Sequence, residues 1–156
     1  MNRIRRENLK AMGGLGVLAL SLAAGLIKTT IAAAAEWNKA AFEGNKLPEV
    51  LKALGASTPV ESKDIEIIAP EIAENGAVVP ITINSKLPNT QNISVMVEKN
   101  PNLLSASFDI PDGTDPYIIT RVKMAETSNV NVLVKADGKY YVASKEIKVT
   151  LGGCGG

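Results

Sequence analysis

The sequence predicts an all-β fold: an immunoglobulin-like antiparallel β-sandwich of seven or eight strands, preceded by short N-terminal helices and followed by a flexible C-terminal arm. Three observations predict it. From residue 64 onward, apolar residues recur with period two, the spacing that places them on one face of a strand. Turn-forming residues separate these runs, and the chain closes on Gly-Gly-Cys-Gly-Gly. The chain therefore divides into residues 1–35, 36–151 and 152–156.

Residues 1–35 have the features of an export signal peptide. A basic start precedes an apolar stretch from Ala11 to Ile27, and a run of alanines from Ala32 to Ala35 precedes Glu36. Cleavage is expected after Ala35. The apolar stretch is shorter than the ~20 residues that a transmembrane helix needs and contains four glycines, so a stable membrane anchor is not expected.

Paired arginines, Arg5 and Arg6, resemble the motif of the twin-arginine export route, which carries proteins across the membrane already folded. Ile4 and Asn8 depart from the residues that this motif prefers. The weakly apolar segment that follows, and Lys28 behind it, favour this route over the general secretory one. The sequence thus predicts a periplasmic mature protein.

Two short helices are expected between Trp37 and Leu54, because apolar residues recur there at three- and four-residue spacing. Gly44-Asn45 is expected to divide this stretch into two helices, and Gly55 to end the second.

The strands are expected where apolar residues alternate, and turn residues mark their ends. Asp137-Gly138, between two such runs, is typical of a type I′ hairpin turn. The clearest alternating runs are Ile65/Ile67, Val79/Ile81/Ile83, Ile93/Val95/Val97, Ile118/Thr120/Val122/Met124, Val130/Val132/Val134 and Ile147/Val149/Leu151.

Composition excludes several kinds of chemistry for this chain alone. It has no histidine, which removes imidazole-based hydrolases and most zinc sites. Its single cysteine removes internal disulfides, Cys-x-x-Cys redox pairs and iron–sulfur clusters. Residues 36–156 hold 12 basic and 15 acidic residues, a net charge of −3, so binding to nucleic acid is not expected.

Two polar loops are candidate sites of lesser weight. Asp109, Asp112 and Asp115 gather three carboxylates that could hold a calcium ion, but proline, aspartate and glycine are also what a turn prefers, and the turn is the favoured interpretation. The loop from Glu98 to Asn102 is a polar connection that could also meet a partner. We expect no metal site and no catalytic residues.

The C-terminus places the only cysteine, Cys154, between Gly152-Gly153 and Gly155-Gly156. An odd cysteine in an exported protein is either an intermolecular disulfide partner or a reactive thiol. The four glycines give it nothing to pack against and great backbone freedom. Three residues beyond Leu151, at ~3.3–3.6 Å each, place Cys154 about 10 Å beyond the sandwich. With no neighbouring group to lower it, the pKa of its thiol is expected near the free value of ~8.5.

These residues resemble the SoxY family, the sulfur-carrying subunit of the periplasmic Sox system of thiosulfate oxidation. The terminal Gly-Gly-Cys-Gly-Gly is that family's signature, and with the export leader the similarity spans essentially the whole chain. Internal stretches that support it are Ile72–Pro80, Val97–Pro101, Thr120–Met124 and Lys145–Thr150.

The resemblance implies a non-enzymatic carrier without a cofactor, which forms a heterodimer with a SoxZ subunit and holds its substrate covalently on Cys154. A c-type cytochrome complex would join thiosulfate to the cysteine oxidatively. A dimanganese hydrolase would release sulfate, and in some organisms a molybdenum sulfane dehydrogenase would oxidise the remaining sulfur. Cys154 would pass through S-thiosulfonate and persulfide forms.

Two other functions stay open at this point. Small ubiquitin-like carriers end in Gly-Gly and hold sulfur as a C-terminal thiocarboxylate, although they depend on a cytosolic ATP-using enzyme, against which the export signal argues. A structural or adhesion sandwich could instead use Cys154 for a covalent dimer.

Overall fold

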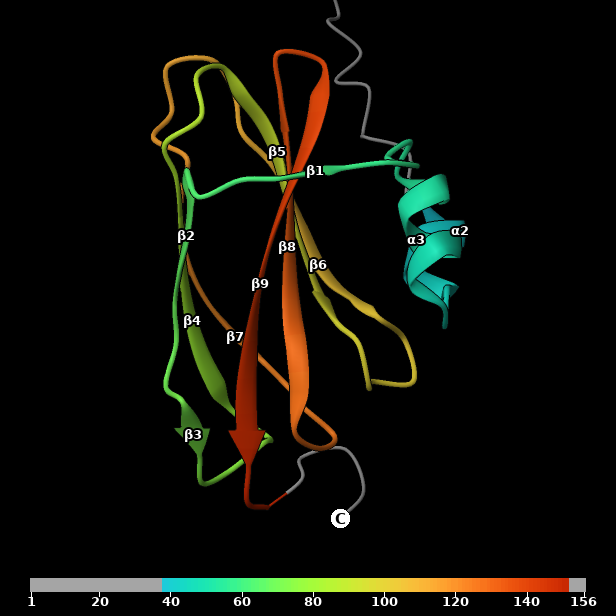
Figure 1. Cartoon of the computed structure of the whole chain (residues 1–156), viewed down its shortest axis with the longest axis vertical. Coiled ribbons are helices and arrows are strands. Elements are labelled where there is room, and N and C mark those ends of the chain that lie inside the picture. Colours follow the sequence, from blue (N-terminus) through green and yellow to red (C-terminus); the bar gives the residue numbers. More distant parts are fainter. Residues whose placement is uncertain (1–37, 152–156) are drawn as a thin grey trace, which may run out of the picture. The chain divides into compact units, whose positions relative to one another are not determined.

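The computed structural model describes residues 38–151, which form two packed β-sheets with two short helices on one side (Figure 1). A six-stranded sheet has the order β1-β9-β8-β5-β6, with β3 also pairing with β9, and a three-stranded sheet has the order β2-β4-β7. This confirms the predicted sandwich. The elements are α2 (Lys39–Glu43), α3 (Leu47–Ala53), β1 (Val60–Glu61), β2 (Ile65–Ile68), β3 (Ile72–Ala73), β4 (Val79–Ser85), β5 (Thr90–Val97), β6 (Leu104–Asp109), β7 (Tyr117–Val122), β8 (Ser128–Ala136) and β9 (Lys139–Val149).

The main core lies between the two sheets and follows the period-two pattern. In β4, Val79, Ile81 and Ile83 are buried while Pro80, between the first two, is exposed. Alternate residues of β5, β8 and the end of β9 complete this core. Burial of these β-branched side chains, at about 25 cal/mol per Å² of apolar surface, is the main term that holds the sheets together.

A second, smaller core joins the helices to the outer face of the six-stranded sheet. Val50 of α3 and Ala41 of α2 are fully buried, in one cluster with Met96 of β5 and Leu133 of β8. Part of β5 and β8 is therefore covered on both faces. Among residues 38–151, no helix is long and apolar enough to cross a membrane.

The predicted division of the helical stretch is confirmed. Residues 44–46 separate the helices, and α3 ends as expected at Gly55, whose φ is +78°. The Ala56 N–H donates to the Leu51 carbonyl (2.7 Å) and the Gly55 N–H to that of Lys52 (3.0 Å), the pattern of a Schellman motif.

The predicted hairpin is also confirmed. Ala136 pairs with Lys139 across a two-residue loop, and Asp137 and Gly138 have φ values of +49° and +70°. A type I′ turn needs positive φ at both central positions, which aspartate tolerates and glycine adopts freely.

The structure adds three strands, β1, β3 and β6, to the six alternating runs named above, which brings the number in residues 38–151 to nine. The two-residue strands β1 and β3 both pair with β9 in parallel, in a sandwich that was expected to be antiparallel. The predicted runs were also too long at two ends. β7 ends at Val122, with Met124 buried beyond it, and β9 ends at Val149, with Leu151 exposed.

Candidate functional site

The last strand, β9, fixes the place from which the predicted arm departs. It lies inside the six-stranded sheet, paired with β8 along nine residue pairs and with β1 and β3 on its other side. Ile147 near its end is fully buried. Its last residue, Val149, pairs with Ala73 of β3 at one end of the sandwich (Figure 1). Both neighbours thus hold β9 in place.

We define the arm base as residues 148–151, which hydrogen bond to residues 71–76. The Lys148 N–H donates to the Glu71 carbonyl (2.9 Å) and the Thr150 N–H to that of Ala73 (3.1 Å). The Leu151 carbonyl accepts from the buried Gly76 N–H (2.7 Å). The chain is thus held up to the last residue before the glycines.

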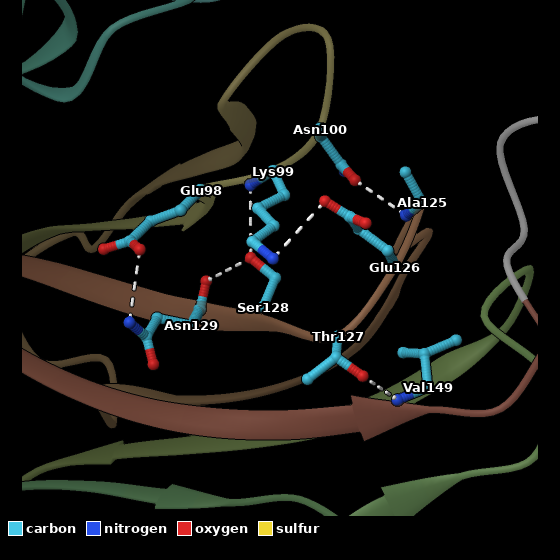
Figure 2. A network of polar contacts seen from close by, with 9 residues as sticks. All are labelled: Glu98, Lys99, Asn100, Ala125, Glu126, Thr127, Ser128, Asn129 and Val149. Carbon is cyan, nitrogen blue, oxygen red and sulfur yellow. Dashed lines mark hydrogen bonds and ion pairs between the residues drawn. The ribbon is translucent and has the colours of Figure 1, made fainter.

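The other side of the arm base is held by the β7–β8 loop. The Val149 N–H donates to Thr127 Oγ1 at 2.9 Å (Figure 2). This bond lies just beyond the last pair of the β8–β9 ladder, Ser128 with Ile147. The Met124 N–H donates to the Gly76 carbonyl at 2.7 Å. The same loop therefore contacts both the end of β9 and the connection between β3 and β4.

The loop from Glu98 to Asn102 joins this network (Figure 2). Asn100 Nδ2 donates to the Lys123 carbonyl (2.7 Å), and Asn100 Oδ1 accepts from the Ala125 N–H (3.0 Å). One side-chain amide thus satisfies two backbone groups of the β7–β8 loop. The Lys99 N–H donates to Ser128 Oγ (3.1 Å), and Lys99 Nζ lies 3.4 Å from Glu126 Oε1. This loop serves here to tie the arm's end of the sandwich together.

The aspartate loop has the contacts of a turn. The Thr114 N–H donates to the Pro111 carbonyl (3.1 Å), and Gly113 has a φ of +80°. Asp109 accepts from the amide of Asn92 at 2.9 Å. Across residues 38–151, no three histidine, cysteine, aspartate or glutamate side chains come close enough to hold a metal ion.

The predicted attachment and export residues lie outside the described part of the chain. They are Cys154, the arm glycines Gly152, Gly153, Gly155 and Gly156, and the arginines Arg5 and Arg6. Sequence reasoning placed Gly76 and Asn100 in turns or loops, but it did not foresee that they and Thr127 make the hydrogen bonds around the arm base. The strand-like run into the glycines was the one signal that pointed to this end of the molecule.

A hollow of about 540 Å³ lies between α3 and the outer face of the large sheet. Leu47, Leu51 and Met96 line it together with polar residues such as Asn131 and Ser144. Ser144 stands five residues before Val149, a distance of about 16 Å along a strand. The hollow is therefore beyond the ~10 Å that three residues can span from Leu151, and we separate it from the arm.

Comparison with known proteins finds a family and a solved structure with substantial sequence identity. The family model described as "Sulfur oxidation protein SoxY" matches residues 50–154. The structure of the sulfur carrier protein SoxY from Chlorobium limicola f thiosulfatophilum is 44% identical, with a TM-score of 0.62, and the match covers 68% of this chain and 97% of that one.

Two superoxide reductases (neelaredoxins) from Ignicoccus hospitalis, one of them the E23A variant, also match. They are 17% and 18% identical, each with a TM-score of 0.49, and the matches cover 63% and 55% of this chain and 86% and 79% of theirs. We attach no functional meaning to a likeness of this extent. No curated protein matches the sequence.

Proposed function

The chain belongs to the SoxY family of sulfur oxidation proteins, and from this premise we propose that it carries thiosulfate-derived sulfur covalently on Cys154 and presents it to partner enzymes. Its role as a sulfur carrier in sulfur oxidation follows from the family. Attachment at Cys154 is supported by one observation above all. The chain is held by hydrogen bonds up to Leu151, and the only thiol follows three residues later among glycines.

Loading is an oxidation that needs an external electron acceptor. The thiol and thiosulfate join as Cys–SH + S–SO₃²⁻ → Cys–S–S–SO₃⁻ + H⁺ + 2e⁻, with a new bond between Cys154 Sγ and the outer sulfur of thiosulfate. In our proposal the two electrons pass to the haems of a c-type cytochrome complex. Because the chain has no histidine and no second cysteine, the oxidising group belongs to the partner.

Release of sulfate is a hydrolysis and needs no electron acceptor. Water attacks the terminal sulfone, and Cys–S–S–SO₃⁻ + H₂O gives Cys–S–S⁻, SO₄²⁻ and two protons. We assign this step to the dimanganese hydrolase, and oxidation of the remaining persulfide, where it occurs, to the molybdenum enzyme. The arm glycines admit Cys154 to each of these sites, since they carry no side chains that would obstruct a narrow channel.

Loading can be tested by counting electrons. Natively purified carrier is mixed with thiosulfate and an excess of the oxidised cytochrome complex, and haem reduction is followed by absorbance. We expect two electrons per carrier thiol and an adduct on Cys154. Two results would contradict the proposal. One is haem reduction that does not depend on the carrier, and the other is an unmodified Cys154 once the haems have been reduced.

Export by the twin-arginine route is a further part of the proposal. Replacing both Arg5 and Arg6 by lysine is expected to leave folded protein in the cytoplasm, because this route requires the paired arginines. Sequencing the N-terminus of the wild-type periplasmic form should give Glu36. Continued export of the double variant would point to the general secretory route. A mature chain that begins at any residue other than Glu36 would contradict cleavage after Ala35.

Heterodimer formation with a SoxZ subunit can be tested independently of loading. Sedimentation of the natively purified protein is expected to show one copy of each subunit in a stable complex. Export in the folded state would allow the two subunits to cross the membrane together. A carrier that sediments as a monomer at micromolar concentration would argue against this partner.

A further inference from the structure

Two threonine hydroxyls hold the arm base from opposite sides. Thr127 Oγ1, on the β7–β8 loop, accepts from the Val149 N–H at 2.9 Å (Figure 2). Thr150 Oγ1 donates to the carbonyl of Glu74, the residue after β3, at 3.0 Å. Neither bond belongs to a strand ladder. Each depends on one side chain, which a substitution can remove while the backbone stays the same.

The Thr127 hydroxyl lies where the β8–β9 ladder has ended. The last pair of that ladder is Ser128 with Ile147, and the same register would place Glu126 opposite Val149, but the pairing stops before it. Because the Val149 N–H is partly buried, leaving it without a partner would cost free energy. Thr127 supplies the missing acceptor and extends the hold on β9 beyond its regular pairing with β8.

Thr150 is held on the β3 side by two bonds of its own. Its N–H donates to the Ala73 carbonyl at 3.1 Å, and its hydroxyl donates to the carbonyl of the next residue, Glu74. Thr150 is exposed, so its side chain adds nothing to the core. The contribution of its hydroxyl is to fix the position of the chain just before the glycines.

The place where the chain is last held decides how many residues separate Cys154 from the folded domain. With Leu151 held, three residues span at most about 10 Å. Release of residues 149–151 would double that number, and the r.m.s. reach of a flexible glycine-rich chain grows as the square root of its length. The volume available to the thiol would grow about threefold, and its effective concentration at a fixed point would fall by the same factor.

We propose that Thr127 and Thr150 are positioning residues for the carrier reaction: they keep the arm at three residues and so concentrate the thiol of Cys154 near one end of the sandwich. The inference rests on the proposed function of Cys154. Neither threonine is assigned a chemical step, because both act through the backbone of the arm base.

The test removes each hydroxyl and keeps the β-branched shape, in Thr127→Val, Thr150→Val and the double variant. Thr127→Ser and Thr150→Ser keep the hydroxyl. The matched control is Thr82→Val. Thr82 is partly buried like Thr127, but it lies in β4, and its hydroxyl makes no hydrogen bond within residues 38–151.

Two measurements are made on the natively purified protein. Hydrogen exchange, followed by NMR at the amides of residues 147, 149 and 150, reports on opening of the arm base. Loading by the cytochrome complex with thiosulfate, measured over a range of carrier concentrations, gives kcat and KM for the carrier.

Each valine variant should speed exchange at its own position, residue 149 or 150, about fivefold, the factor that corresponds to one net hydrogen bond. The amide of buried Ile147, the control and both serine variants should exchange as in wild type. In the double valine variant, kcat for loading should fall about two- to threefold with KM unchanged, because the thiol is diluted only after the complex has formed.

The exchange and loading results can each overturn the inference. Unchanged exchange in both valine variants, or an equal rise in Thr82→Val, would show that the hydroxyls do not hold the arm base. Faster exchange with an unchanged kcat in the double variant would show that the hold does not position the thiol. If the wild-type protein gains no adduct, the proposed function fails and the positioning role fails with it, whatever the exchange rates.

Discussion

Replacing Cys154 by serine is expected to abolish thiosulfate-dependent loading completely. Loading forms a sulfur–sulfur bond through a thiolate, and a serine hydroxyl neither ionises near neutral pH nor forms a stable bond to sulfur under these conditions. No second thiol in the chain could replace it. The measurement is the intact mass of the variant after incubation with thiosulfate and the cytochrome complex.

The control for this variant is its stability. Residue 154 lies beyond β9, so the free energy of unfolding should change by no more than the ~0.5 kcal/mol typical of surface substitutions. A Cys154→Ser protein that still gains sulfur would contradict the carrier cysteine. It would point instead to a thiocarboxylate at Gly156, the site that a ubiquitin-like carrier would use.

Substituting Gly153 by valine is expected to slow loading and unloading by every partner enzyme, by about tenfold or more, since a misplaced reacting group costs rate steeply. A β-branched side chain next to Cys154 widens the arm and stiffens its backbone, and both changes oppose entry into a narrow channel. Gly153→Ala, with a single methyl group, should lie between wild type and Gly153→Val. The measurement is the initial rate of adduct formation with each purified partner.

Alkylation by iodoacetamide separates access to a channel from access to the thiol. Because this reagent needs no channel, its rate with Gly153→Val should stay near that of wild type. If Gly153→Val loads and unloads at wild-type rates, the glycines are not needed for Cys154 to enter the partner enzymes.

The sandwich could be predicted because its inward-facing strands obey a simple rule. Residues such as Ile81 and Ile83 alternate with more exposed residues, and the turn at Asp137-Gly138 needs the two positive φ values that these residue types tolerate. Gly55 predicted the end of α3 for a similar reason, because the residue after a helix often needs a positive φ. In each case the local backbone requirement and the residue type agree.

Other elements leave no such trace. Met96 and Leu133 are buried because the helices cover the outer face of the large sheet, a contact between distant segments that strand periodicity does not encode. β1 and β3 are only two residues long, too short for a period to show, and they are defined by pairing with β9. Strand β6 is different: Leu104, Ala106 and Phe108 alternate with serines at period two, and the sequence prediction missed this run.

The site was predicted in its chemistry but not in its support. The role proposed for Cys154 and the glycines could be inferred from the sequence alone, because it depends only on residues that are neighbours in the chain. The network that holds the arm base depends on single polar groups, such as the amide of Asn100 and the hydroxyl of Thr127. In sequence these are ordinary loop residues; in the fold Asn100 bonds to the β7–β8 loop and Thr127 to the end of β9.

The most direct test of the account is the chemical state of Cys154 in the cell. The protein is purified without reductant from cells oxidising thiosulfate and cleaved with trypsin after Lys148, so that residues 149–156 form one peptide containing the only cysteine. Mass spectrometry of this peptide should show S-thiosulfonate and persulfide forms that disappear on reduction and are absent from cells given no sulfur compound. A peptide found only as free thiol, or only as a disulfide with a second copy of itself, would contradict the carrier.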